Sequence, residues 1–349
     1  MEIRTRKIVK RFLTGLLIVV AIVVIVFWDL LSYAARQGYG QFFIIWNAKP
    51  VEEFLKDPQF PDSLKARLNL IEEVRKYGID SLGLTDTENY KTMFDQKGKE
   101  VMWVVMACEP FQLKPKEWDF PIVGSVPYKG FFNEKLAVQL KSQLETEGWD
   151  VIVRNPGGWS TLGWFTDPIL SKMLSRSEGD LANLIIHEMS HATIFVKDSI
   201  DFNENLATFI GDRGAEKFLI DKYGARSKEY TTYMEEDKDY LKFVDHMLRG
   251  AKSLDSLYKT MNPADTSGQK RLLKEATIRS IVNALDTLSL KLTSTPSKRF
   301  RKELPNNAYF MNFRQYQSKQ TSFGDEWKSK FNGDLRAYIR YFSLKYPFL

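Results

Sequence analysis

Two of the three histidines in this 349-residue sequence stand four positions apart. They begin and end the segment His187-Glu188-Met189-Ser190-His191, an H-E-x-x-H pattern. Residues four apart share one face of a helix, so both imidazoles can bind one zinc ion. Glu188 is rotated by about 100° around that helix and is placed to act as a general base on water held at the ion. With so few histidines, this spacing arises by chance roughly once in several hundred cases. The competing interpretation is a pair of hydrogen-bonded core histidines.

A catalytic zinc site needs a third protein ligand and an open fourth position. The longer pattern that ends in a third histidine is absent, because Ile194 and Lys197 stand where it requires Gly and His. His246 is 55 residues beyond His191, so a carboxylate is the expected ligand. The candidates that follow the motif closely are Asp198, Asp201 and Glu204.

Glu204 is the favoured third ligand. It opens the next predicted helix, and a turn over residues 198–202 would bring that helix back antiparallel, with Glu204 beside the histidines. Ala207 and Thr208, in the following turn, are small enough to let the two helices pack closely. Asp198 is expected on the end of the same helix as the motif, where its reach to the ion is poor.

The elements that must position these residues are mainly helices. Apolar periodicity predicts helices in much of 33–84 and at 133–147, 180–197, 203–223, 228–261, 269–292 and 335–344. Buried strands are expected at 101–107 and 149–154, with Gly-rich aromatic loops around them. The basic segment 297–302, Ser-Lys-Arg-Phe-Arg-Lys, is expected to be a solvated loop. The pattern indicates an α+β fold, mainly helical, with a small β-sheet.

Most of the formal charge of +6 belongs to a short N-terminal tail. Residues 1–11 carry five basic side chains against one acidic, which leaves 45 basic and 43 acidic residues in the rest of the chain. The near-neutral body gives no indication of nucleic-acid binding. Residues 12–28 carry no charge, and 12–35 are predicted to form a transmembrane anchor, with a cleaved signal peptide as the alternative. The positive flank then stays in the cytoplasm and residues from about 36 onward are exported.

Several motifs carry a resemblance that extends from about Tyr39 to the C-terminus. They are G-x-V-x-Y-K-G-F-F at Gly124–Phe132, STLGWFTDP at Ser160–Pro168, HEMSHAT at 187–193, FNENLA at 202–207, and Asn306-Asn307-Ala308 with Tyr316. H-E-x-x-H followed by N-E-x-x-A is the gluzincin arrangement, and the chain resembles the bacterial putative zinc aminopeptidase family. Many members place a lipid-modified cysteine after the apolar segment. Here the single cysteine is Cys108, so an intact helix must anchor the chain.

The resemblance implies a zincin-like metallopeptidase domain over 36–349, with His187, His191 and Glu204 as ligands of one Zn²⁺ ion and Glu188 as the base. In gluzincin-like enzymes a Tyr or His stabilises the oxyanion of the tetrahedral intermediate. Tyr316 is the first candidate here because it belongs to a family-like segment. The remaining candidates for that role are Tyr128 and His246.

The sequence therefore predicts a membrane-anchored zinc peptidase, by its resemblance an aminopeptidase of the bacterial inner membrane. Its catalytic domain faces the extracytoplasmic side, and its partners are a peptide substrate and the membrane. A strand edge at Ser160–Gly163 is expected to pair with an extended substrate. The alternative is a membrane-tethered chaperone or binding protein that keeps a zinc site without hydrolysing peptides. The intact Glu188 argues against it, since a structural site needs no base.

Overall fold

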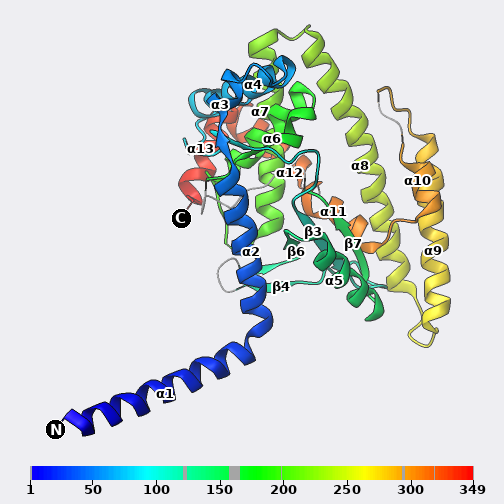
Figure 1. Ribbon diagram of the computed structural model, residues 1–349. Helices are drawn as coiled ribbons and strands as arrows, with labels where there is room; N and C mark the ends of the chain where they lie inside the picture. Colours follow the sequence, from blue (N-terminus) through cyan, green and yellow to red (C-terminus); the bar gives the residue numbers. More distant parts are fainter. Residues whose placement is uncertain are drawn as a thin grey trace. The chain divides into compact units, whose positions relative to one another are not determined.

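The computed structural model describes residues 2–120, 124–156, 166–197, 199–292, 295–317 and 319–348, except the side chains of 2–5, 7, 8, 315 and 316. The chain forms two units, Met1–Asn47 and Ala48–Leu349. The H-E-x-x-H motif and all the candidate site residues lie in the second unit (Figure 1).

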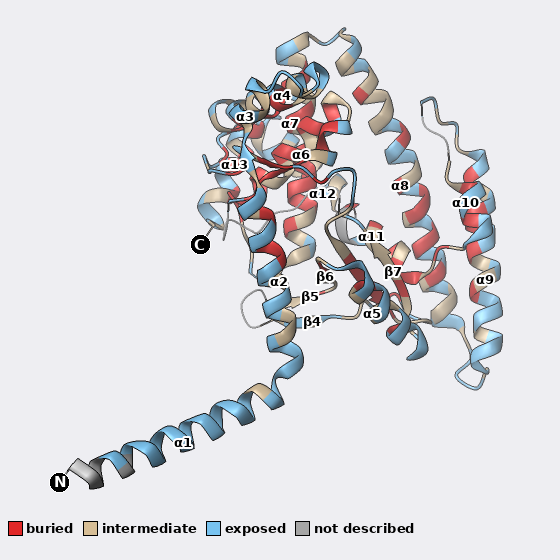
Figure 2. Cartoon of the chain, in the orientation of Figure 1, coloured by how far each residue is buried: buried red, intermediate tan, exposed pale blue. Residues whose placement is uncertain are grey.

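The first unit consists of helices α1 (Glu2–Val26) and α2 (Trp28–Asn47). Within α1, Val9–Val26 has a mean hydropathy of 2.5, and none of this stretch is buried. Figure 2 shows the described part of α1 as almost entirely exposed. A helix of this length and composition can span a membrane, and a signal sequence has the same properties. The anchor predicted over 12–35 overlaps this helix.

The second unit is mainly helical, as predicted. Its α-helices are α3 (Val51–Lys56), α4 (Asp62–Tyr77), α5 (Glu134–Thr146), α6 (Glu178–His191), α7 (Ile200–Tyr223), α8 (Lys228–Thr260), α9 (Ser267–Ala284), α10 (Ser297–Lys302), α11 (Asn307–Gln317), α12 (Gln320–Phe331) and α13 (Leu335–Lys345). Short helical turns of other types are η1 (Gly78–Leu82), η2 (Ser171–Ser175) and η3 (Leu285–Thr287).

Small sheets lie between the helical blocks. Their strands are β1 (Lys49–Pro50), β2 (Thr92–Phe94), β3 (Trp103–Cys108), β4 (Trp118–Phe120), β5 (Gly124–Val126), β6 (Lys129–Phe131), β7 (Asp150–Arg154) and β8 (Ile169–Leu170). The strand orders are β1-β2-β8, β6-β3-β7 and β4-β5. The central strand β3 pairs antiparallel with β6 and β7, and it is buried because α5 and α11 pack against it. The two predicted strands are therefore confirmed, although the β-structure is divided among several sheets.

Three sequence-based expectations about helices were wrong. The helix predicted over 269–292 ends at Ala284, and the Lys291 and Leu292 amides instead donate hydrogen bonds to the Asp239 carboxylate of α8. The helix that carries the motif ends at His191 and not at 197, because Ile194 forms an isolated bridge to Pro347 instead of continuing the helix. The basic segment 297–302 forms α10 and is not a loop. Its buried Phe300 packs into the core between α8, α9 and α11. This burial stabilises the helix, and the basic charge of the segment gives no indication of it.

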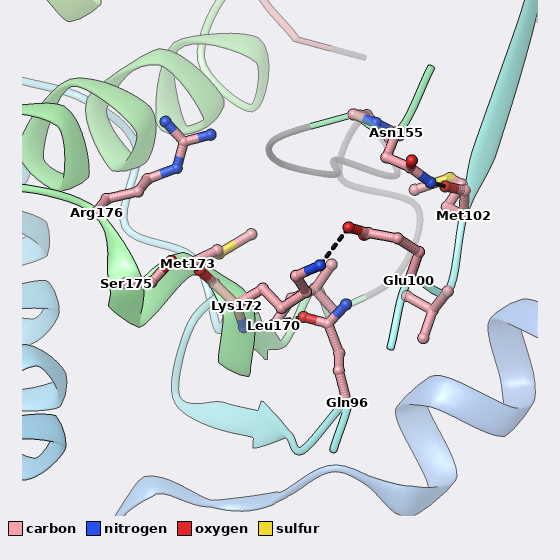
Figure 3. Close-up of a pocket in the computed structure, with 11 residues that line it drawn as sticks. Gln96, Glu100, Met102, Asn155, Leu170, Lys172, Met173, Ser175 and Arg176 are labelled. Carbon is pink, nitrogen blue, oxygen red and sulfur yellow. Dashed lines mark hydrogen bonds and ion pairs between the residues drawn. The ribbon is translucent and has the colours of Figure 1, made fainter. Parts of the chain in front are cut away.

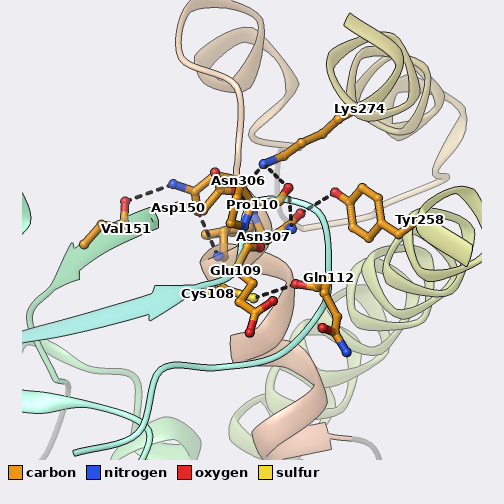
Figure 4. A network of polar contacts seen from close by, with 11 residues as sticks. Cys108, Glu109, Pro110, Gln112, Asp150, Val151, Tyr258, Lys274, Asn306 and Asn307 are labelled. Carbon is orange, nitrogen blue, oxygen red and sulfur yellow. Dashed lines mark hydrogen bonds and ion pairs between the residues drawn. The ribbon is translucent and has the colours of Figure 1, made fainter. Parts of the chain in front are cut away.

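The Asn306-Asn307 pair fastens the start of α11 to the central sheet (Figure 4). Asn306 Nδ2 donates to the Val151 carbonyl at 2.9 Å, and the Asn307 backbone amide donates to Asp150 Oδ2 at 2.7 Å. Asn307, which is fully buried, also accepts from the Tyr258 hydroxyl at 2.7 Å. Lys274 from α9 forms an ion pair with Asp150 in the same cluster. This family-like motif therefore holds helices and sheet together.

Candidate metal centre and active site

The motif helix α6 begins at a side-chain cap and is buried along one face. Ser177 Oγ accepts a hydrogen bond from the Asp180 amide at 3.3 Å, which stabilises the first turn. Leu181 and Ile185 are fully buried. Burial of this face fixes the rotation of the helix, and so directs His187 and His191 toward α7.

The structure brings His187, His191 and Glu204 together. Their ligand atoms all lie within 4.8 Å of one another, in a group that can hold a metal ion. The Nε2 atoms of the histidines are 3.2 Å apart. Glu204 Oε2 lies 3.6 Å from His187 Nε2 and 3.7 Å from His191 Nε2. The side chains are 16%, 6% and 15% exposed, so the cluster is largely shielded yet reachable.

Two asparagines that flank Glu204 fix the first turn of α7. Asn203 Oδ1 accepts from the Val196 amide at 2.9 Å, and its Nδ2 donates to the Val196 carbonyl at 2.8 Å. This pair of bonds clamps the connection between α6 and α7. Asn205 Oδ1 accepts from the Lys319 amide at 2.9 Å, which fastens the same turn to the start of α12. The N-E-N sequence therefore holds the carboxylate in place from both sides.

Close contact between α6 and α7 depends on glycine. A Cβ at Gly211 would lie 2.8 Å from Asn183 Oδ1 and 3.2 Å from His187 Cβ. A Cβ at Gly214 would lie 2.8 Å from Ile186 Cγ2. Separations under 3.0 Å are not tolerated by real Cβ atoms, so any side chain here would force the helices apart. Ala207 is buried in this helix as expected, but the glycines one and two turns later form the close approach.

The protonation states of the site are set by burial and by the opposed charges. Burial raises the pKa of Glu188, and the nearby charge of Glu204 acts in the same direction. Burial raises the pKa of Glu204, but the histidine partners outweigh it and hold that pKa well below its usual range. Burial lowers the pKa of His191, yet the Glu204 charge outweighs burial and the net shift is upward. Glu204 is thus an ionised carboxylate, whereas Glu188 takes up a proton more readily than an ordinary glutamate does.

Sequence reasoning missed Tyr90, which lies near Glu188. Tyr90 is 2% exposed, and its hydroxyl has no hydrogen-bond partner among the described residues. Burial raises its pKa, with further contributions from Glu188 and Asp167. Its amide donates to the Asp167 carbonyl at 2.8 Å, and its φ of 64° lies in the left-handed region that non-glycine residues rarely adopt. The only sequence signal was Asp167 itself, within the Ser160–Pro168 motif.

A second missed group lies on the α7 side of His187. Asp212 Oδ1 accepts a hydrogen bond from Asn183 Nδ2 at 2.7 Å. Asn183 lies one helical turn before His187 on α6. Burial and the charge of Asp237 raise the pKa of Asp212 to about 7. Asp212 lies outside the motifs, and no spacing in the sequence distinguishes it from the other acids of α7.

The other predicted residues occupy varied places. Asp201 lies in the first turn of α7, and burial raises its pKa while Lys319 and Arg314 oppose that shift. His246 Nε2 lies 2.8 Å from the Ile281 carbonyl, so its ring serves the contact between α8 and α9. Tyr128 is half-buried between β5 and β6. The residues that lie outside the described part of the chain are Asp198, the Tyr316 side chain and the Ser160–Gly163 edge.

Comparison with known proteins identifies the family to which the chain belongs. The model of a family described as "Putative aminopeptidase" matches residues 32–344. No curated protein and no solved structure matches the chain. The matched region contains the H-E-x-x-H motif, Glu204 and both flanking asparagines. Because the match covers most of the sequence, this chain belongs to that aminopeptidase family.

Proposed function

We propose that this protein is a membrane-anchored, zinc-dependent aminopeptidase with a zincin-like active site. The observation that carries the proposal is the convergence of two imidazole nitrogens and one carboxylate oxygen from α6 and α7. The family supports peptide hydrolysis as the reaction. Two histidines, one carboxylate and an adjacent glutamate are the set that zinc peptidases use.

The distances fit a single tetrahedral ion. Ligand atoms that each lie about 2.0–2.1 Å from zinc at tetrahedral angles stand about 3.4 Å apart. The three separations here are 3.2, 3.6 and 3.7 Å. The two histidine nitrogens lie within hydrogen-bond distance of each other and Glu204 lies within ion-pair distance of both, and an ion bound between them would replace these direct contacts. Three protein ligands leave the fourth position that a catalytic site needs.

Glu188 and Glu204 have different roles in the proposed reaction. The chemistry that a zinc ion supplies there is Lewis-acid activation of a water molecule and of the scissile carbonyl. Glu188 accepts the proton of the attacking water and later delivers it to the leaving amine. The raised pKa of Glu188 suits this exchange, because a general base works best when its pKa approaches the working pH. Glu204, held ionised, balances the charge of a bound cation.

Metal analysis of the wild type and two variants tests the site. The full chain, purified in detergent, should contain one zinc ion per chain. Glu204→Ala should lose most of that zinc, whereas Asp201→Ala, which removes another acid of the same helical turn, should keep it. Wild-type protein without stoichiometric zinc after zinc loading, or equal retention in both variants, would overturn the metal assignment.

Hydrolysis of a peptide library tests the reaction. Glu188→Gln should keep the zinc and lose activity by at least about a hundredfold, because the general base is gone. N-terminal acetylation of the peptides should block cleavage if the enzyme is an aminopeptidase. Stoichiometric zinc in a protein that cleaves no peptide would instead support the tethered chaperone or binding protein.

A further inference from the structure

A cavity beside the H-E-x-x-H helix is lined by one charged side chain that has no ion pair or hydrogen bond with the described residues. The cavity has a volume of about 280 Å³ and lies where β7, β8 and η2 meet the chain segments around β2 and β3 (Figure 3). This volume is near the lower end for small-molecule pockets, and suits a ligand the size of an amino-acid side chain. Its apolar walls include Val101, Met102, Leu170 and Met173.

Most polar groups of this cavity are already paired. Lys172 forms an ion pair with Glu100, and its amide donates to Gln96 Oε1 at 3.0 Å. Asn155 Nδ2 donates to the Met102 carbonyl at 2.7 Å, and Ser175 Oγ donates to the Lys172 carbonyl at 2.8 Å. The lysine and glutamate cancel each other's charge, so these groups give the cavity no net charge.

Arg176 is the exception. Among the residues that the structure describes, its guanidinium forms neither an ion pair nor a hydrogen bond. Figure 3 shows it on the opposite side of the cavity from Glu100 and Asn155. Arg176 directly precedes Ser177, the cap of α6, where the helix dipole adds positive potential. The cavity therefore has apolar walls and one available cation.

The cavity lies at the start of α6, the helix that carries Glu188 near its other end. A helix of this length is about 20 Å long, a span that a short extended peptide covers. A peptide that follows α6 from Glu188 can therefore place a neighbouring group near Arg176.

We propose that this cavity is a substrate subsite that binds a carboxylate of the peptide through Arg176. The inference rests on the proposed peptidase function, which supplies the peptide. A guanidinium binds a carboxylate through two parallel hydrogen bonds, and the apolar walls accommodate the carbon chain that carries it. The carboxylate belongs either to an acidic side chain or to the C-terminus of a short peptide.

Binding to an inactive protein tests the subsite without requiring turnover. The Glu188→Gln full chain in detergent, loaded with zinc, is titrated with peptide pairs that differ only in charge. One pair carries Glu or Gln at successive positions from the N-terminus, and the other carries a free or amidated C-terminus. The carboxylate peptide of one pair should bind at least about tenfold tighter, as expected for a charge-assisted hydrogen bond. The responding pair identifies the source of the carboxylate.

Variants of Arg176 test whether its guanidinium causes the preference for the carboxylate peptide. Arg176→Gln should abolish the preference, and Arg176→Lys should keep part of it, because lysine retains the charge without the planar fork. Arg271→Gln removes one charge from an exposed site on α9 and should keep the full preference. The lysine variant remains informative if the glutamine variant fails to fold.

Two results would overturn the subsite: equal binding of charged and neutral peptides by the starting protein, or an unchanged preference after Arg176 is replaced. Failure of the proposed function has a different signature. In that case the protein with Glu188 intact cleaves no peptide, although the Arg176-dependent preference in binding persists.

Discussion

At the scale of single residues, the candidate site combines one carboxylate that is held ionised with acids that burial pushes toward neutrality. Glu204 is held ionised by its histidine partners, whereas burial raises the pKa of both Glu188 and Asp212. Tyr90 adds a buried hydroxyl that has no partner among the described residues. These groups are costly for folding, as residues that serve a site often are.

Tyr90→Phe is expected to leave stability unchanged or to raise the free energy of unfolding by up to about 1 kcal/mol, because a buried hydroxyl without a partner contributes only its desolvation cost. Chemical denaturation of the full chain in detergent measures the change. Tyr338→Phe is the matched control, since the Tyr338 hydroxyl donates to Glu326 Oε2 at 3.1 Å and its removal should destabilise by about 1 kcal/mol. Equal destabilisation by the two variants would show that the Tyr90 hydroxyl has a partner.

Asp212→Asn is expected to stabilise the protein more at pH 8 than at pH 5. The pKa of Asp212 is raised from 3.8 to about 7 by burial and by Asp237, with Arg213 and His187 opposing the shift. The folded protein therefore binds more protons than the unfolded chain between these values. Stability from this group is complete below about pH 4 and is lost as the pH rises through 7.

Melting temperatures of variant and wild type at both pH values, with a chelator present, measure this difference. The exposed Asp245, replaced by Asn, serves as the control and should show no such pH dependence. A stabilisation by Asp212→Asn that is the same at pH 5 and pH 8 would contradict the assigned shift.

At the scale of elements, the site is made by two consecutive helices that pack closely. Helix α6 supplies both histidines and Glu188, and α7 supplies Glu204 and the two glycines that permit contact. The Asn203 clamp fixes the turn between them. An aromatic cluster that includes Phe202, Phe323 and Phe342 holds the start of α7 against α12 and α13.

Gly211→Ala should destabilise the protein by about 1–3 kcal/mol, because the new methyl group overlaps Asn183. It should also weaken zinc binding at least about tenfold, because α7 carries Glu204 away from the histidines. Calorimetric titration of the apo protein with zinc measures the affinity. Gly268→Ala in α9, where the nearest atom is 3.9 Å away, should be neutral or stabilising and should keep the zinc affinity.

At the scale of the whole molecule, the chain joins an apolar helix to a mainly helical unit that carries the site. The apolar stretch Val9–Val26 contributes nothing to the site, and the basic tail 1–11 accounts for most of the net charge. Orientation by that charge would place the proposed peptidase outside the cytoplasm.

Alkaline extraction of membranes from a bacterial host distinguishes an anchor from a cleaved signal. The full chain should remain in the membrane pellet at its complete mass of 40.5 kDa. Protease added outside the inner membrane should digest the second unit, since export of residues after α1 exposes it. A soluble product shorter by the apolar segment would support cleavage instead.

The sequence by itself determined the features that depend on local spacing. Histidines four apart on a periodic helix must share a face, and a carboxylate at the start of the next helix can return to them, so His187, His191 and Glu204 were predictable. Strands β3 and β7 followed from their continuous apolar runs. The end of α6 and the existence of α10 did not follow, because a long-range bridge and a buried Phe300 override the local pattern.

Only the tertiary structure decided which distant residues lie near the candidate site. Tyr90, Asp167 and Arg176 come from loops before α6, and no periodicity relates them to Glu188. The tertiary structure also showed the role of Asn306-Asn307, which hydrogen-bonds the start of α11 to the sheet. The physical reason is that helical spacing is fixed within one element. Burial, charge coupling and the availability of Arg176 depend instead on how separate elements pack.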